Sequence, residues 1–154
     1  MSKTWAIVLS IIGGLFLLAI VAIGVVGYWF YQNKGRLIRA AVDIEKVAKE
    51  FGAKTDNEGC LNEAVSRQKS DKSVTGRIST TAFLTVCLQE SKPSPGFCDS
   101  VPASGEIMKS VTWRLKKCAD AGLQNDQGCQ QLFGVVQSYC QRSKKENGER
   151  EKTQ

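Results

Sequence analysis

The pattern of apolar and polar positions divides the chain near residue 31. From Trp5 to Phe30 there are 26 residues without a charge, and Ser10 is the only non-aromatic side chain among them that carries a polar group. As a helix this segment would be ~39 Å long, which exceeds the roughly 30 Å of hydrocarbon in a bilayer. Aromatic rings of the kind enriched at membrane interfaces stand at its two ends: Trp5, Tyr28, Trp29 and Tyr31. The pattern predicts a transmembrane anchor within residues 1–31.

A cleaved signal peptide is the alternative reading of the same segment. The start "MSK" is a short basic region, and Ala22 to Gly24 offers a small-x-small cleavage site. The apolar core before that site would be longer than is usual for a signal peptide. Cleavage would also leave the apolar run "VVGYWFY" at the new N-terminus. We therefore favour an uncleaved anchor.

Small residues recur along one side of the predicted membrane helix. Ala6, Ser10 and Gly14 are four residues apart, and Gly13 and Gly24 fall on nearly the same face because they are eleven apart. Small side chains let two helices approach closely in lipid. The spacing predicts a contact with another membrane protein or a second copy of the chain; the alternative is that small residues are simply common in such helices.

An amphipathic helix is predicted over residues 32–52. Its apolar stripe has spacings of four, three, four and three residues and precedes Gly52, a helix-ending residue: Leu37, Ala41, Ile44, Ala48 and Phe51. It could continue the membrane helix, with Gly35 as a weak point. The stripe favours packing against the protein's own domain, and pairing with another chain is the alternative.

The rest of the chain reads as short helices separated by turns. Helices are predicted from Cys60 to Gln68, with Asp56 or Asn57 as the cap, and from Arg77 to Glu90. All three prolines lie in "SKPSPGFCDSVP", which must interrupt helical structure. From Arg142 onward there is no apolar residue, so residues 143–154 are predicted to fray into a disordered tail.

Two further helices are predicted after the prolines. One carries an apolar stripe made of Ile107, Met108, Val111, Leu115 and Cys118. Trp113 lies off this stripe, so we expect another helix to cover it; the alternative is an indole exposed for binding. The last helix carries Cys129, Leu132, Phe133, Val136 and Cys140. The predicted fold is all-α, with one N-terminal transmembrane helix and a cysteine-rich domain of about four to five helices over residues 53–142.

The six cysteines all follow the apolar segment, and none forms a C-x-x-C pair. Zinc sites and thioredoxin-type redox motifs usually begin with such pairs. Antiparallel helices joined by a turn bring together residues equidistant from that turn. Cys60 and Cys87 are centred on "KSDKSVTG", and Cys118 and Cys129 are centred on "GLQND". We predict disulfides within these two pairs and between the remaining Cys98 and Cys140; buried reduced thiols are the alternative.

Several chemistries are excluded by composition. The chain has no histidine, so a Ser-His-Asp triad, a Cys-His pair and an H-E-x-x-H zinc helix are impossible. It also lacks phosphate-binding glycine motifs, and its net charge of +6 is spread among alternating signs rather than gathered for nucleic acid. We predict no catalytic residues, metal ligands or cofactor. An enzyme of unrecognised type is the minority alternative, with Asp99 and Glu106 as its best candidate carboxylates.

Charge and cysteines give opposite predictions of topology. Five basic residues follow the span within about 20 positions, against Lys3 before it, which favours a cytoplasmic C-terminus. Disulfides require an oxidising compartment. We follow the cysteines and expect the domain in a bacterial periplasm. Trp29, Lys34, Arg36 and Arg39 are then expected at the lipid headgroups.

The expected function is that of a non-enzymatic binding or accessory subunit of an envelope complex. Its expected partners are membrane lipid and another membrane protein or a second copy of the chain, with no nucleic acid and no small-molecule substrate identified. The alternative is a cytoplasm-facing, membrane-tethered thiol sensor or metal-binding module.

Overall fold

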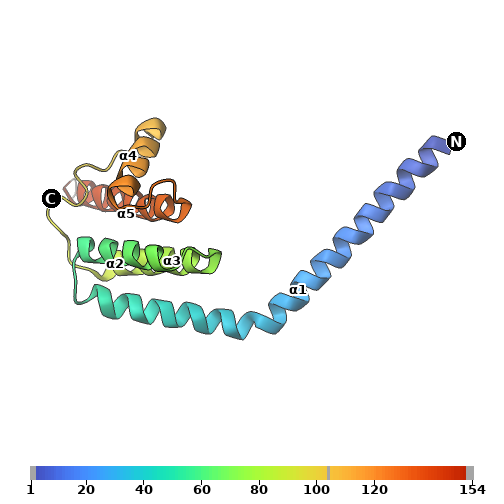
Figure 1. The fold of residues 1–154 in the computed structure, drawn as a ribbon, viewed down its shortest axis with the longest axis horizontal. Helices are drawn as coiled ribbons and strands as arrows, with labels where there is room; N and C mark the ends of the chain where they lie inside the picture. Colours follow the sequence, from blue (N-terminus) through green and yellow to red (C-terminus); the bar gives the residue numbers. More distant parts are fainter. Residues whose placement is uncertain (1–2, 104, 152–154) are drawn as a thin grey trace. The chain divides into compact units, whose positions relative to one another are not determined.

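The computed structural model describes residues 3–103 and 105–151, and its regular structure is helical (Figure 1). The helices are α1 (Lys3–Gly52), α2 (Asn57–Ser70), α3 (Val74–Glu90), α4 (Ile107–Asp120) and α5 (Gln127–Glu151). The described residues contain no strand, only one isolated bridge between Asp56 and Lys92. The all-α prediction is confirmed.

The chain forms two compact units, residues 1–40 and residues 41–154. The second unit is called the head below. The sequence placed boundaries at residues 31 and 52, whereas the last turns of α1 belong to the head. Ala48 is fully buried there, and the Phe51 ring lies 5.8 Å from that of Phe83. The stripe of residues 32–52 therefore packs on its own domain at its C-terminal end, as expected.

The first unit contains an apolar stretch whose described residues are not buried. Ile12–Trp29 has a mean hydropathy of 2.2, and it is long and apolar enough to cross a membrane. Every large hydrophobic side chain described in this stretch is exposed. Such a helix is compatible with a membrane anchor or with a signal sequence.

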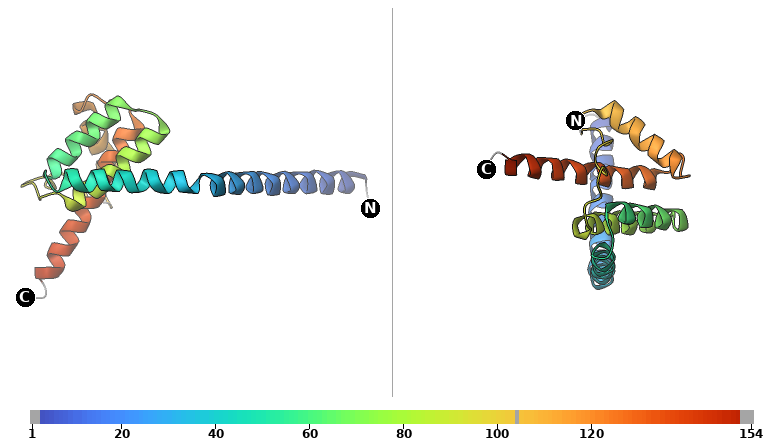
Figure 2. Two further views of the ribbon diagram at one scale, coloured as in Figure 1. Left: turned by 90° about the horizontal axis from the view of Figure 1, so that it is seen from below. Right: turned by 90° about the vertical axis from the view of Figure 1, so that its left-hand side faces the viewer.

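The head is a layered bundle. α2 and α3 form a hairpin, α5 packs against both, and α4 packs against α5 (Figure 2). The core holds Phe83, Leu84, Leu88, Leu132 and Val136, together with five of the six cysteines. The buried cysteines therefore lie within the same core as the large apolar side chains.

Short polar side chains set where the helices begin. Asp56 caps α2 by accepting a hydrogen bond from the Gly59 amide (2.8 Å), and Ser73 caps α3 by accepting one from the Gly76 amide (3.0 Å). Asp56, rather than Asn57, is thus the cap. Both helices begin three residues earlier than the apolar pattern predicted, because a cap contributes no apolar signal.

The proline-containing segment between α3 and α4 is irregular but tied down. Asn57 is buried at the start of α2, where its side chain accepts from the Ser94 amide (3.0 Å) and donates to Ser91 Oγ (2.8 Å). The Lys92 amide donates to the Thr55 carbonyl (3.1 Å). The segment is therefore held against the hairpin and can present Cys98 to α5.

The last helix is longer than expected. α5 continues to Glu151, beyond Arg142, where the sequence predicted fraying. The added turns are rich in arginine, lysine and glutamate, which are good helix formers although they bury nothing.

Candidate functional site

The six cysteines form three disulfides in the pairs predicted. The Cα–Cα distances are 5.8 Å for Cys60–Cys87, 5.4 Å for Cys98–Cys140 and 5.8 Å for Cys118–Cys129. The first joins α2 to α3, the third joins α4 to α5, and the second ties the proline-containing segment to α5. No free cysteine is left in the head.

Paired sulfurs do not serve as metal ligands or as reactive thiols. The described residues also contain no group of three or more histidine, cysteine, aspartate or glutamate side chains that could hold a metal ion. In this oxidised form, the cysteines serve as cross-links.

Three glycines of the small-residue face have open space beside them within the part of the apolar helix that the structure describes. A Cβ added at Gly13, Gly14 or Gly24 would meet nothing within 4 Å in the part of the chain that the structure describes. The side chains of Ala6 and Ser10 lie outside the described residues. A contact of this face with another helix stays a prediction.

The residues predicted at the lipid headgroups lie in the middle of α1. Trp29 is exposed, and Arg39 Nε donates to the Gly35 carbonyl one turn earlier (3.2 Å). The side chains of Lys34 and Arg36 lie outside the described residues. The assignment of these residues to headgroups remains a prediction.

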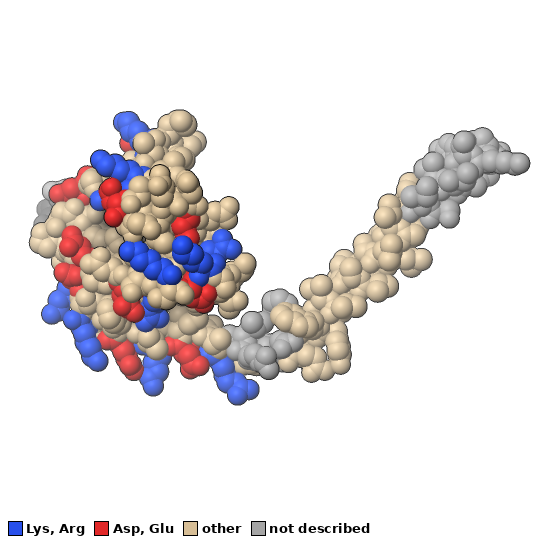
Figure 3. Space-filling view, viewed as in Figure 1, with Lys and Arg blue, Asp and Glu red and all other residues tan. Residues whose placement is uncertain are grey.

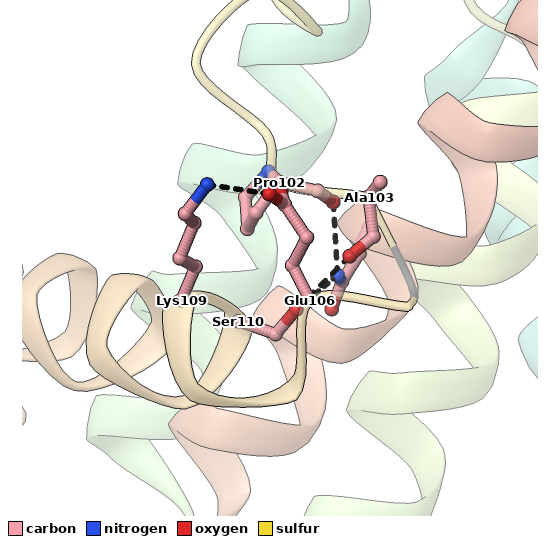
Figure 4. A network of polar contacts seen from close by, with 6 residues as sticks. Pro102, Ala103, Glu106, Lys109 and Ser110 are labelled. Carbon is pink, nitrogen blue, oxygen red and sulfur yellow. Dashed lines mark hydrogen bonds and ion pairs between the residues drawn. The ribbon is translucent and has the colours of Figure 1, made fainter.

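The two carboxylates considered for catalysis lie on the surface around the proline-containing segment. Glu106 pairs with Lys109 at the start of α4, where Ser110 Oγ also donates to the Ala103 carbonyl (3.4 Å) (Figure 4). The hydrogen bond from Lys109 and its positive charge lower the pKa of the Glu106 carboxyl. Asp99 is exposed.

The apolar stripe of α4 faces outward, although an apolar stripe would ordinarily be expected to face the core. Trp113, off the apolar stripe, is half-buried, and its ring meets Phe133 edge-on at 5.6 Å. The stripe itself faces outward except at Cys118, and its other residues are 42–78% exposed. We call its exposed part the apolar face of α4: Ile107, Met108, Val111 and Leu115.

A buried polar network fixes this orientation of α4. The Gln137 side chain donates to Ser110 Oγ (2.7 Å) and to the Pro102 carbonyl (3.0 Å), and it accepts from Arg114 (2.6 Å). Ser110 and Gln137 are both buried. Turning the apolar stripe inward would break these bonds and leave buried polar groups without partners.

A shallow groove of about 920 Å³ runs between α3 and α5, with Arg114 of α4 at its side. We call it the basic groove, and its lining residues are Thr81, Thr85, Arg114, Gln131, Gly134, Val135, Ser138, Gln141, Arg142 and Lys145. Three of them are cationic and none is acidic. Among the residues that the structure describes, the buried atoms Thr81 Oγ1, Arg114 Nε and Gln141 Nε2 find no hydrogen-bond partner.

The basic groove and the apolar face of α4 are neighbours. A smaller hollow of about 220 Å³ lies between α4 and α5, lined on the α4 side by Ile107, Val111 and Arg114. On the α5 side, Ser138 and Gln141 line both this hollow and the basic groove. One face of the head thus joins exposed aliphatic side chains to a cationic groove.

Sequence reasoning missed the basic groove. Its residues come from three helices and are up to 64 positions apart, from Thr81 to Lys145. Seven of them follow one stripe of α5 at helical spacing, but their side chains are a mixture of polar, apolar and cationic types, so the stripe has no hydrophobic or charged pattern that marks it. The sequence shows the apolar stripe on α4, but it does not show whether the stripe faces the core or the solvent.

Comparison with known proteins finds no match: no family model, no curated protein and no solved structure resembles this chain.

Proposed function

We propose that the protein is a single-pass membrane-anchored binding subunit whose disulfide-linked head lies outside the cytoplasm, most simply in a bacterial periplasm. The observation that carries this proposal is the complete pairing of the six cysteines in the head. Structural disulfides persist in oxidising compartments and are rare in the cytosol. The apolar stretch Ile12–Trp29 supports the anchor.

The position of the cysteines within the head supports the same compartment. Five of the six cysteines are almost completely buried. Losing a native disulfide from a small secreted domain typically costs about 2–5 kcal/mol. A head made in a reducing compartment would have to fold without this contribution.

Binding is favoured over catalysis because of what the head surface offers. The basic groove presents hydroxyl, amide and cationic groups without a histidine or a carboxylate. Such groups can recognise a ligand, but they include no general base that titrates near neutral pH. An accessory role in an envelope assembly follows from this surface together with the anchor.

Alkylation of intact cells tests the proposal. Cells that express the full chain are treated with a maleimide reagent before and after reduction, and the mass added to the protein is measured. We expect no alkylation before reduction and six additions after reduction and unfolding. A cytosolic cysteine protein in the same cells is the control and should react at once.

The second hypothesis, a cytoplasm-facing thiol sensor, predicts the opposite result. Six reactive thiols without a reductant would contradict the periplasmic proposal. The basic residues that follow the span are the observation that favours this alternative.

A further inference from the structure

We infer that the face of the head formed by the apolar face of α4 and the basic groove is a docking surface for an anionic lipid bilayer. This inference rests on the proposed function, because the anchor would keep the head close to a membrane. It goes further by assigning a second lipid contact, made by the folded head itself.

The first support is the composition of the exposed side of α4. Ile107, Met108, Val111 and Leu115 point away from the core, and Thr112 and Ala119 beside them are exposed and uncharged. In Figure 3 an uncharged area lies at the top right of the head, with charged side chains to its left. Aliphatic residues on one side of a helix with cations at its borders are typical of helices that lie in a membrane interface.

The second support is the distribution of charge next to these aliphatic residues. Arg114 lies at one border of the apolar face, and the exposed Lys116 lies beyond the other. Arg142 and Lys145 follow along the basic groove, which has no acidic lining residue. Phosphate oxygens accept hydrogen bonds and attract arginine and lysine, so this groove is complementary to lipid headgroups.

The third support is a second apolar border on the other side of the groove. Val74 and Ile78 are 63% and 65% exposed, and their spacing places them on the side of α3 that carries Thr81. The cationic groove therefore lies between two sets of exposed aliphatic residues. A bilayer interface offers acyl chains beside phosphates and can satisfy both kinds of surface together.

Charge argues against a second copy of the chain as the occupant. A two-fold symmetric contact brings the same surface of both copies together. Here it would bring Arg114, Arg142 and Lys145 of both copies into one interface, and the groove has no acidic lining residue to pair with them. An anionic partner is therefore favoured. The apolar face of α4 also lacks the aromatic residues that dominate protein interfaces.

The test places a probe on the intact chain in lipid nanodiscs. A fluorescent amino acid replaces Met108 in one variant and Ser66 in another. Ser66 is the control, because it is exposed on α2 and lines neither the basic groove nor the smaller hollow beside it. The discs contain nitroxide-labelled lipid, with phosphatidylcholine alone or mixed with phosphatidylglycerol. We expect the probe at position 108 to lose most of its fluorescence in the anionic discs and the probe at position 66 to keep it.

A charge reversal supplies the second arm. The double substitution Arg142→Glu and Lys145→Glu should restore most of the fluorescence at position 108 in anionic discs. Lys144→Glu is the control, because Lys144 is exposed on the same helix but does not line the groove. Its quenching should stay as in the parent.

The outcomes separate the inference from the proposed function. Equal quenching at positions 108 and 66 in a chain that stays with the disc overturns the inference alone. Cross-linking of two chains through α4 without quenching overturns it in favour of a second copy. A chain that washes off the disc in high salt overturns both the inference and the membrane anchor.

Discussion

At the scale of single residues, the contact between Gly128 and Gln68 leaves little room for a larger side chain. Gln68 is fully buried, and its amide nitrogen donates to Asp126 (3.0 Å), which also accepts from the Cys129 amide at the start of α5 (2.8 Å). A Cβ at Gly128 would lie 2.2 Å from that amide nitrogen. The Gln68 side chain cannot withdraw without losing its bond to Asp126.

Gly128→Ala should therefore destabilise the head by about 1–3 kcal/mol, the usual range for overpacking a core. Gly134→Ala in the same helix is the control, because its Cβ would meet Arg114 at an ordinary 3.6 Å. That change should stabilise the head by about 0.5–1 kcal/mol through helix propensity. Urea unfolding followed by circular dichroism measures both; equal signs for the two variants would contradict the prediction.

The Asp71 carboxylate makes the stability of the head depend on pH in the acidic range. Its carboxylate accepts from the Ser73 amide (2.9 Å), and hydrogen bonds from Ser73 lower its pKa below the usual 3.8. Because the folded-state pKa is lower, the unfolded chain binds more protons as pH falls through this range, and stability is lost.

Asp71→Asn should flatten this dependence. The midpoint of urea unfolding is compared at pH 7 and pH 3 for the parent and the variant. We expect the parent to lose more stability between the two values, because asparagine does not titrate. An equal loss in both would mean that the acid sensitivity comes from other carboxylates, such as Glu45 beside Lys49, whose pKa is also lowered.

At the scale of helices and cross-links, the sequence predicted which cysteines pair better than it predicted which face of a helix is buried. Cysteine pairs follow from distances along the chain to a turn, and these distances are fixed by the sequence. The direction of α4 does not follow, because its apolar stripe shows that two faces differ and not which one is covered. Burial of Ser110 and Gln137 against the proline-containing segment decided it, and those contacts join parts of the chain far apart in sequence.

The three disulfides should differ in how much they stabilise the head. They close loops with sequence separations of 27, 42 and 11 residues. In the chain-entropy model, removing Cys98–Cys140 should cost about 4 kcal/mol and removing Cys118–Cys129 about 3 kcal/mol. Paired cysteine-to-serine variants, compared by their urea midpoints, should unfold in that order; the reverse order would show that strain or packing outweighs loop closure.

At the scale of the whole molecule, the chain combines two opposing topological signals. Five basic residues follow the span, which favours a cytoplasmic head, while the disulfides favour an oxidising compartment. The two can be reconciled if the basic residues act at the outer headgroups after insertion and do not set the orientation.

Replacing Lys34, Arg36 and Arg39 together with glutamine separates these roles. If the head lies outside the cytoplasm against the positive-inside rule, removing positive charge from the outer side should leave the orientation unchanged or make it more uniform. Protease added to spheroplasts measures the fraction of heads exposed. Moving the same charges ahead of the span is the control and should also favour an outer head. A fall in the exposed fraction of the glutamine variant would mean that these residues are needed to set the orientation, contrary to the proposed role at the lipid surface.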